Sequence, residues 1–214
     1  MNRMSLSLAS GHAVPDTPPP PILGPAVPQH RGALVRLLGR TILRAAGWKL
    51  IGTIPDLPRF VVIVAPHTSN WDFPIGLAAK WALGFDVSFL AKDSLFRPST
   101  GWFMRAVGGI PVNRHTTNAL VDESAKTFAQ RERMVLVIAP EGTRHKVEKW
   151  RSGFWHIARA ANVPVVCSAI DWGTKEVRFG PTVTVNADVE PAVDIARIKA
   201  HYDNARGYHP ALQA

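Results

Sequence analysis

Two side chains near residue 70 have the types and the spacing of a general base and its orienting acid. His67 and Asp72 stand five positions apart, in the stretch His67-Thr-Ser-Asn-Trp-Asp72. Neutral imidazole is a common proton acceptor near pH 7, and it works best when one ring nitrogen donates to a fixed carboxylate. The pair therefore favours proton transfer by His67 with Asp72 as its support, although a chance pairing at this spacing stays open at this point.

The elements around the pair strengthen the functional interpretation. An apolar, β-branched run at 60–64 predicts a buried strand, which Ala65-Pro66 ends. Ser69 or Asn70 is a natural N-cap for a helix over about 70–83. His67 then follows a strand end, and Asp72 lies in the first helical turn, where unpaired N–H groups and the helix dipole favour a carboxylate. Open α/β sheets place their chemistry at such an edge.

A second strand ends in the same way. The run 134–139 is the strongest prediction of a buried strand, and it leads into Pro140-Glu-Gly-Thr-Arg144. Further strands are expected at 48–54, 86–91, 109–114 and 164–170, and one or two strands, broken at Gly180-Pro181, at 177–185. Further helices are expected at 117–131, 152–161 and 191–201. This alternation predicts an α/β fold, a single domain with a mostly parallel mixed sheet flanked by helices.

The N-terminal part has a different character. Residues 1–30 are rich in proline and predict a disordered leader, followed by a domain over 31–205 and a tail over 206–214. Residues 32–47 predict an amphipathic helix with a basic stripe of Arg36, Arg40 and Arg44. The opposite face is apolar (Leu34, Val35, Leu38, Ile42, Ala45, Ala46). Two interpretations stay open: the helix packs on the core with its arginines in solvent, or it lies in a membrane interface with its arginines on lipid phosphates.

Composition narrows the classes of partner. The formal net charge of +9 indicates an acidic partner such as nucleic acid, anionic lipid or an anionic substrate. No P-loop, zinc-ligand or RNA-binding signature supports nucleic acid. The single cysteine, Cys167, excludes an internal disulfide, and its apolar strand predicts an inert thiol. No signal peptide and no apolar run long enough to span a bilayer is evident, so any membrane contact is expected at the surface.

Four blocks in this order resemble the glycerophospholipid acyltransferase family, which includes the 1-acylglycerol-3-phosphate acyltransferases. His67-Thr-Ser-Asn-Trp-Asp72 matches its block of a histidine, four residues and an aspartate, and Pro140-Glu-Gly-Thr-Arg144 matches its Glu-Gly-Thr-Arg block. Gly109-Ile-Pro-Val-Asn-Arg114 and Val163-Pro164-Val165 resemble the other two. The resemblance covers roughly residues 59–170.

The resemblance implies transfer of a fatty acyl group from a thioester, on coenzyme A or acyl carrier protein, to a lyso-lipid hydroxyl. His67 would be the base and Asp72 its orienting carboxylate. Arg114 and Arg144 would bind phosphate, and Lys92 is a further anion-site candidate. Glu141 would orient Arg144 or the acceptor, Gly142 would permit a close approach or a turn with positive φ, and Thr143 would contact substrate or cap the loop. Backbone N–H groups near the helix start or the Gly142 turn are candidates for the oxyanion hole. No metal or other cofactor is expected.

Features that differ from the family bear on the acceptor. His145 stands where many relatives carry a small hydroxyl residue, and residues 146–154 are unusually charged. Lysophosphatidate is the default acceptor, and another lyso-lipid such as a lyso-ornithine lipid is an alternative. A thioesterase-like hydrolase using the same dyad is the other, although the chain has no Gly-x-Ser-x-Gly nucleophile elbow. The expected location is cytoplasmic, peripheral on the inner face of an anionic membrane.

Overall fold

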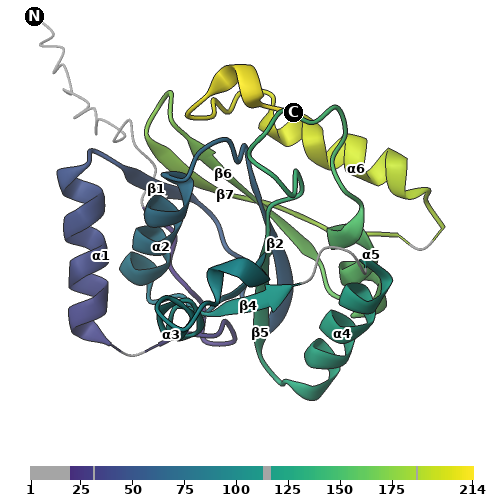
Figure 1. Ribbon diagram of the computed structural model, residues 1–214, viewed down its shortest axis with the longest axis horizontal. Helices are drawn as coiled ribbons and strands as arrows, with labels where there is room; N and C mark the ends of the chain where they lie inside the picture. The colour runs from purple at the N-terminus through teal and green to yellow at the C-terminus, as the bar shows by residue number, and fades with distance from the viewer. Residues whose placement is uncertain (1–19, 31, 113–116, 187) are drawn as a thin grey trace, which may run out of the picture.

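A seven-stranded sheet forms the centre of the molecule, in a computed structural model that describes residues 20–30, 32–112, 117–186 and 188–214. The strand order is β1-β7-β6-β2-β5-β3-β4, and neighbouring strands are parallel except for β6 and β7. The strands are β1 (Lys49–Gly52), β2 (Arg59–Ala65), β3 (Ser88–Lys92), β4 (Gly109–Val112), β5 (Met134–Ile138), β6 (Val165–Asp171) and β7 (Glu176–Val183). The predicted mostly parallel mixed sheet is confirmed (Figure 1).

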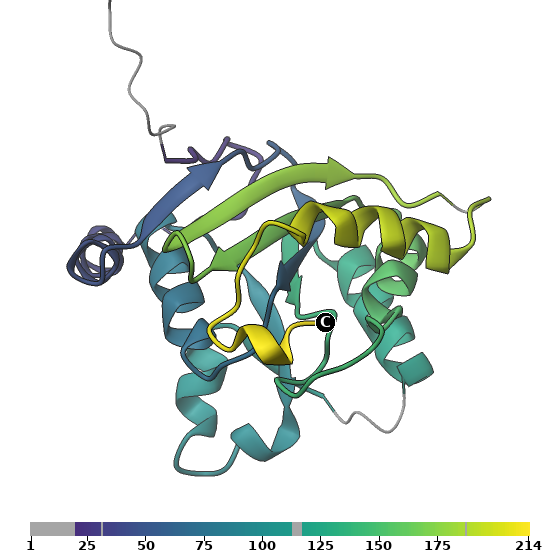
Figure 2. The same ribbon diagram turned by 90° about the horizontal axis from the view of Figure 1, so that it is seen from above.

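Helices cover both faces of this sheet, as the view from above shows (Figure 2). One face carries α4 (Thr117–Gln130), α5 (Gly153–Ala160) and α6 (Pro191–Lys199). The other carries α2 (Asp72–Leu83), with α1 (Ala33–Ala45) packed beside it. Short helices complete the chain: η1 (Asp93–Leu95), α3 (Gly101–Ala106), η2 (Ala200–Tyr202) and η3 (Pro210–Leu212).

The two faces of β2 build separate parts of the core because successive side chains of a strand point in opposite directions. Val61 and Ile63 pack with Phe154 and Trp155 of α5. Phe60 and Val62 pack on the other side with Val27 and other apolar residues. A strand that is buried on both faces reads as a continuous apolar run, which is why its position was predictable from the sequence.

The last part of the predicted disordered leader is ordered. The first part, residues 1–19, lies outside the described residues, but residues 20–30 pack against the fold. Val27 is fully buried, Gln29 forms a bridge with Phe85, and the Ala26 N–H donates to the Asp56 carboxylate at 2.7 Å. Proline favours extended backbone, and here the proline-rich chain packs in an irregular extended form along the sheet.

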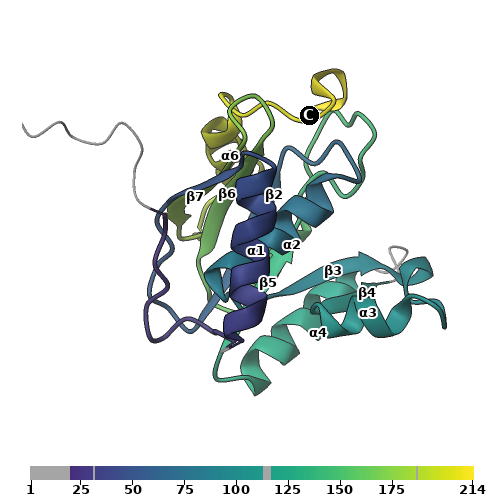
Figure 3. The ribbon, with the colours of Figure 1, turned by 90° about the vertical axis from the view of Figure 1, so that its left-hand side faces the viewer.

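The side of helix α1 that packs on the protein is not its predicted apolar face. Helix α1 lies beside α2 (Figure 3). Gly39 and Leu43 are buried, and Gly39 lies against the backbone of Ala78 and Ala82 in α2. Leu34 and Leu38 of the predicted apolar face are 81% and 49% exposed, and the neighbouring Leu37 is 62% exposed, so the apolar face points away from the protein. The first interpretation had this face on the core, and that is wrong. No helix in the described part of the chain is long and apolar enough to cross a membrane.

Candidate active site

The predicted dyad forms at the carboxyl end of β2. His67 follows that strand, and Asp72 is the first residue of α2. The His67 Nδ1 atom lies 3.1 Å from Asp72 Oδ2, and the two side chains are 22% and 2% exposed. The imidazole is therefore open to a substrate on one side, while its carboxylate partner is enclosed.

The Asp72 carboxylate is held by several donors at once. Its Oδ2 atom accepts the backbone N–H groups of Thr68 and Ser69, at 3.0 and 2.9 Å, in addition to the His67 contact. Trp71 is the N-cap of α2 and makes no side-chain cap; the Ser69 hydroxyl accepts the Trp71 N–H instead. The expected cap by Ser69 or Asn70 is thus replaced by a loop that folds around the carboxylate.

Trp172 is a functional candidate that the sequence reasoning missed. Its Nε1–H donates to Asp72 Oδ1 at 2.8 Å, which pairs the second carboxylate oxygen. The ring packs edge-on between Trp48 and Tyr208, with centroid distances of 4.8 and 4.6 Å. Trp172 directly follows β6, so its place after an apolar strand was a signal that could have identified it.

Glu141 approaches the dyad from β5, the neighbour of β2 in the sheet. Its Oε2 atom accepts the backbone N–H of His67 at 2.8 Å, and the side chain is buried. Burial raises the pKa of Glu141, and the hydrogen bond from the His67 backbone opposes that rise. Glu141 therefore braces the loop that carries His67. Among the described residues it makes no ion pair with Arg144, which was one of the two expected partners beside the acceptor.

The turn after Glu141 requires glycine. Gly142 has φ of +67°, and a Cβ atom there would lie 2.7 Å from Arg151 Nε. The expected turn with positive φ is therefore present, whereas the near neighbour is the flexible Arg151 side chain and not backbone. The Thr143 hydroxyl accepts the His145 N–H at 3.3 Å, which caps the loop.

The candidate anion-binding residues lie at the same edge of the sheet or beyond the described part. Arg144 is exposed in the loop after β5, and Lys92 is exposed at the end of β3, which pairs with β5. Arg114 lies outside the described residues. The structure thus brings Glu141 to the dyad and leaves Arg144 and Lys92 accessible near the edge where the dyad stands.

Most of the suggested oxyanion donors already have partners. The N–H groups of His67, Thr68 and Ser69 bond to carboxylates, and that of Trp71 bonds to the Ser69 hydroxyl. The Gly142 N–H bonds to the Ala139 carbonyl at 3.0 Å. In this conformation these groups serve to fix the two loops.

The C-terminal segment also supports the catalytic loop. The His209 N–H donates to the Thr68 hydroxyl at 3.0 Å, and Gly207 packs so closely on Thr68 that a Cβ atom would lie 2.7 Å from that hydroxyl. The last residues, which we expected to be a tail, therefore pack against Thr68, the residue that follows His67.

The single cysteine has no role in this site. Cys167 lies inside β6, and burial raises the pKa of its thiol to about 11, as expected of an inert cysteine. Within the described ranges, no group of three or more His, Cys, Asp or Glu side chains is arranged to hold a metal ion.

Two comparisons found known proteins to which this chain is similar. The model of the Acyltransferase family matches residues 53–171, a span that contains both loops of the site. The fold is similar to that of the 1-acyl-sn-glycerophosphate (LPA) acyltransferase PlsC from Thermotoga maritima, with a TM-score of 0.55 and 17% identity over 81% of this chain and 80% of that one. No curated protein matches by sequence. The family match covers more than half of the chain, and the protein therefore belongs to the Acyltransferase family.

Proposed function

We propose that this acyltransferase moves a fatty acyl group from a thioester to the hydroxyl of a lyso-lipid, with lysophosphatidate as the first acceptor to test. The observation that carries the proposal is the contact between His67 Nδ1 and the buried Asp72 carboxylate at 3.1 Å. A carboxylate on Nδ1 fixes the tautomer in which Nε2 is the proton acceptor. Among the described residues no hydrogen bond to Nε2 is found.

The proposed reaction has two steps at one carbonyl carbon. His67 Nε2 takes the proton of the acceptor hydroxyl while its oxygen attacks the thioester carbonyl, which forms the new C–O bond. The tetrahedral intermediate then expels the thiolate, which breaks the C–S bond, and the imidazolium returns the proton to sulfur. Asp72 stabilises the imidazolium between the two steps. No covalent enzyme intermediate is needed, because the thiolate is a good leaving group.

Arg144 supports a phosphate-bearing acceptor. Its exposed guanidinium follows the loop that Glu141 anchors to His67, and guanidinium groups bind phosphate through paired hydrogen bonds. We propose the same role for Lys92 and Arg114. The Arg144→Gln variant should raise the KM for lysophosphatidate about ten-fold or more, with little change in kcat. The Lys146→Gln variant, which removes an exposed cation from the same loop, is the control and should leave the KM unchanged.

A product assay tests the whole proposal. Purified protein is given labelled acyl-CoA or acyl carrier protein with lysophosphatidate, with lyso-ornithine lipid, or with no acceptor, and the lipids are identified by mass. The proposal expects phosphatidate. Acylation of lyso-ornithine lipid alone would overturn the assignment of the acceptor. Release of free fatty acid without an acceptor, at a rate equal to transfer, would instead identify a thioesterase.

We also propose that the protein binds an anionic membrane surface through α1, on the cytoplasmic face where thioester donors are found. The exposed apolar face of α1 and its flanking arginines are typical of helices that lie in a membrane interface. Sedimentation with phosphatidylglycerol vesicles should fall strongly for the Leu34→Glu/Leu37→Glu variant. The Leu57→Glu/Val193→Glu variant, altered at exposed apolar residues elsewhere, is the matched control. Equal binding by both variants would contradict this role of α1.

A further inference from the structure

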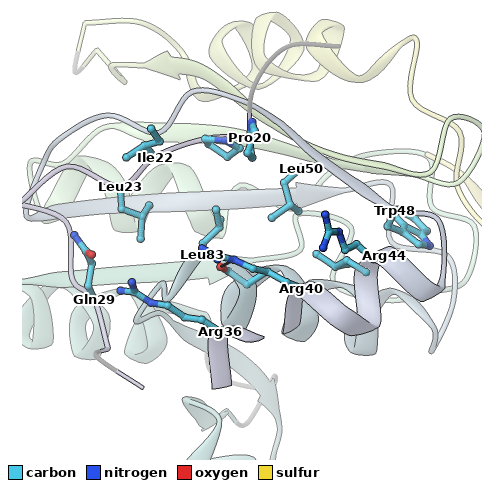
Figure 4. A pocket seen from close by; sticks show the side chains of 13 residues that line it. Pro20, Ile22, Leu23, Gln29, Arg36, Arg40, Arg44, Trp48, Leu50 and Leu83 are labelled. Carbon is cyan, nitrogen blue, oxygen red and sulfur yellow. Dashed lines mark hydrogen bonds between the residues drawn. The ribbon is translucent and has the colours of Figure 1, made fainter. Parts of the chain in front are cut away.

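A groove beside helix α1 has no role in the proposed reaction. It lies between α1, the edge strand β1 and the segment that precedes α1, and it has a volume of about 500 Å³ (Figure 4). Cavities of this size hold small ligands. None of the dyad or loop residues lines it.

One wall of the groove is basic. Arg36, Arg40 and Arg44 extend from successive turns of α1 along the groove (Figure 4). No acidic residue lines it, and no ion pair found in the described part of the chain includes any of the three. Arg36 and Arg40 each donate one long hydrogen bond to a backbone carbonyl, at 3.3 and 3.4 Å. A guanidinium has five N–H donors. The Nε of Arg36 is buried, but the exposed Arg40 keeps most of its donors available to an anion.

The remaining wall is apolar. Leu23, Leu43, Trp48, Leu50 and Leu83 contribute side chains that a free inorganic anion would not require. A ligand that satisfies both walls carries a negative charge at one end and a hydrocarbon chain at the other. Burial of hydrocarbon contributes about 25 cal/mol per Å², so the chain adds affinity that phosphate alone lacks.

The position of the groove indicates which kind of amphiphile it would bind. The arginines lie on the flank of α1, between the groove and the exposed leucine face that Leu34 and Leu37 form. A helix in this orientation at a bilayer would hold its arginines at the depth of the lipid phosphates. From these observations we infer that the groove binds one anionic phospholipid, with its phosphate on Arg40 and Arg44 and an acyl chain along Leu23, Leu43 and Leu50. This site is separate from the acceptor site at His67 and does not depend on the reaction proposed there.

The test uses lipids that dissolve as monomers, so that binding to a bilayer plays no part. Full-length protein with the His67→Ala substitution, which prevents turnover, is titrated in a calorimeter with dihexanoyl phosphatidylglycerol, dihexanoyl phosphatidylcholine and inorganic phosphate. The expected result is saturable binding of one phosphatidylglycerol, with affinity about ten-fold or more above that of either other ligand. Added to this background, Arg40→Gln/Arg44→Gln should weaken the binding about ten-fold or more. Lys126→Gln/Arg131→Gln, which removes the same charge from the region of α4, should leave it unchanged.

Four results would overturn the inference. Equal affinity for inorganic phosphate would identify a free-anion site, and equal affinity for the zwitterionic lipid would make the arginines irrelevant. Equal loss in the two double variants would mean that binding follows net charge. Failure of phosphatidylglycerol to bind to the His67→Ala protein, which circular dichroism shows to be folded, would exclude the site. Each variant is checked for folding in the same way.

Discussion

The Asp72 carboxylate gives the sharpest test of the site, because its two oxygens face different donors. Asp72 Oδ2 accepts from Thr68, Ser69 and His67, whereas Oδ1 accepts from Trp172 Nε1 at 2.8 Å. In the Asp72→Asn variant the amide oxygen will take the place of Oδ2, where three donors meet. The amide NH₂ then points at the Trp172 N–H, and two donors oppose each other.

The magnitude follows from this geometry. A buried donor without an acceptor costs about 1–3 kcal/mol, so Asp72→Asn should lower the free energy of unfolding by at least that amount. In the Trp172→Phe background the opposing donor is gone, and the same substitution should cost about 1–3 kcal/mol less. Urea denaturation of the four proteins in this double-mutant cycle measures the difference.

Activity should not follow stability in this cycle. The amide oxygen still accepts from His67 Nδ1, so the tautomer is kept, but the negative charge that supports the imidazolium is lost. Acyl transfer should fall about 10²–10⁴-fold for Asp72→Asn in both backgrounds. If the Trp172→Phe background restores the activity together with the stability, Asp72 serves only the fold, and the proposed electrostatic role is wrong.

Two further predictions concern Glu141 and Gly39. Because burial raises the pKa of Glu141, the folded protein favours its protonated form, and the free energy of unfolding should fall as the pH rises from the ordinary value of 4.5 through the raised value. The Glu141→Gln variant keeps an acceptor for the His67 N–H and lacks this fall. Urea denaturation should therefore show that its stability advantage over the wild type is larger at about pH 7 than at about pH 4. An equal difference at both pH values would refute the assignment. A Cβ atom on Gly39 would lie 2.4 Å from the Ala82 backbone nitrogen, so Gly39→Val should destabilise the protein by about 1–3 kcal/mol and loosen α1 to proteolysis. Gly76→Ala in α2, where a Cβ atom has room, is the control, and an equal loss there would contradict the packing argument.

The sheet and the dyad were predictable because they depend on local patterns. Continuous apolar runs mark strands that are buried on both faces, and residues that follow parallel strands meet at one edge. His67, Asp72 and Glu141 could therefore be placed together before the fold was known. The single strand β7 runs through Gly180, where the sequence left one strand or two open.

The place of Trp172 after β6 was a signal in the sequence, but the contacts that support the dyad could not be predicted, because they join segments far apart in the chain. Trp172 reaches Asp72 across 100 positions, and His209 reaches Thr68 across 141. The orientation of α1 was ambiguous for a related reason. Its periodicity defines an apolar face and a basic stripe, but the buried contact forms at Gly39, where small size matters and hydrophobicity does not.

The central claim is that His67 takes the proton of the acceptor hydroxyl. The direct measurement is the rate of transfer from a labelled acyl thioester to lysophosphatidate by the wild type, by His67→Ala and by His201→Ala, which alters an exposed histidine elsewhere. Loss of the base should lower the rate of His67→Ala about 10²–10⁴-fold, with lysophosphatidate binding and the unfolding curve retained, while His201→Ala matches the wild type. Transfer by a folded His67→Ala protein within a few-fold of the wild-type rate would contradict the claim.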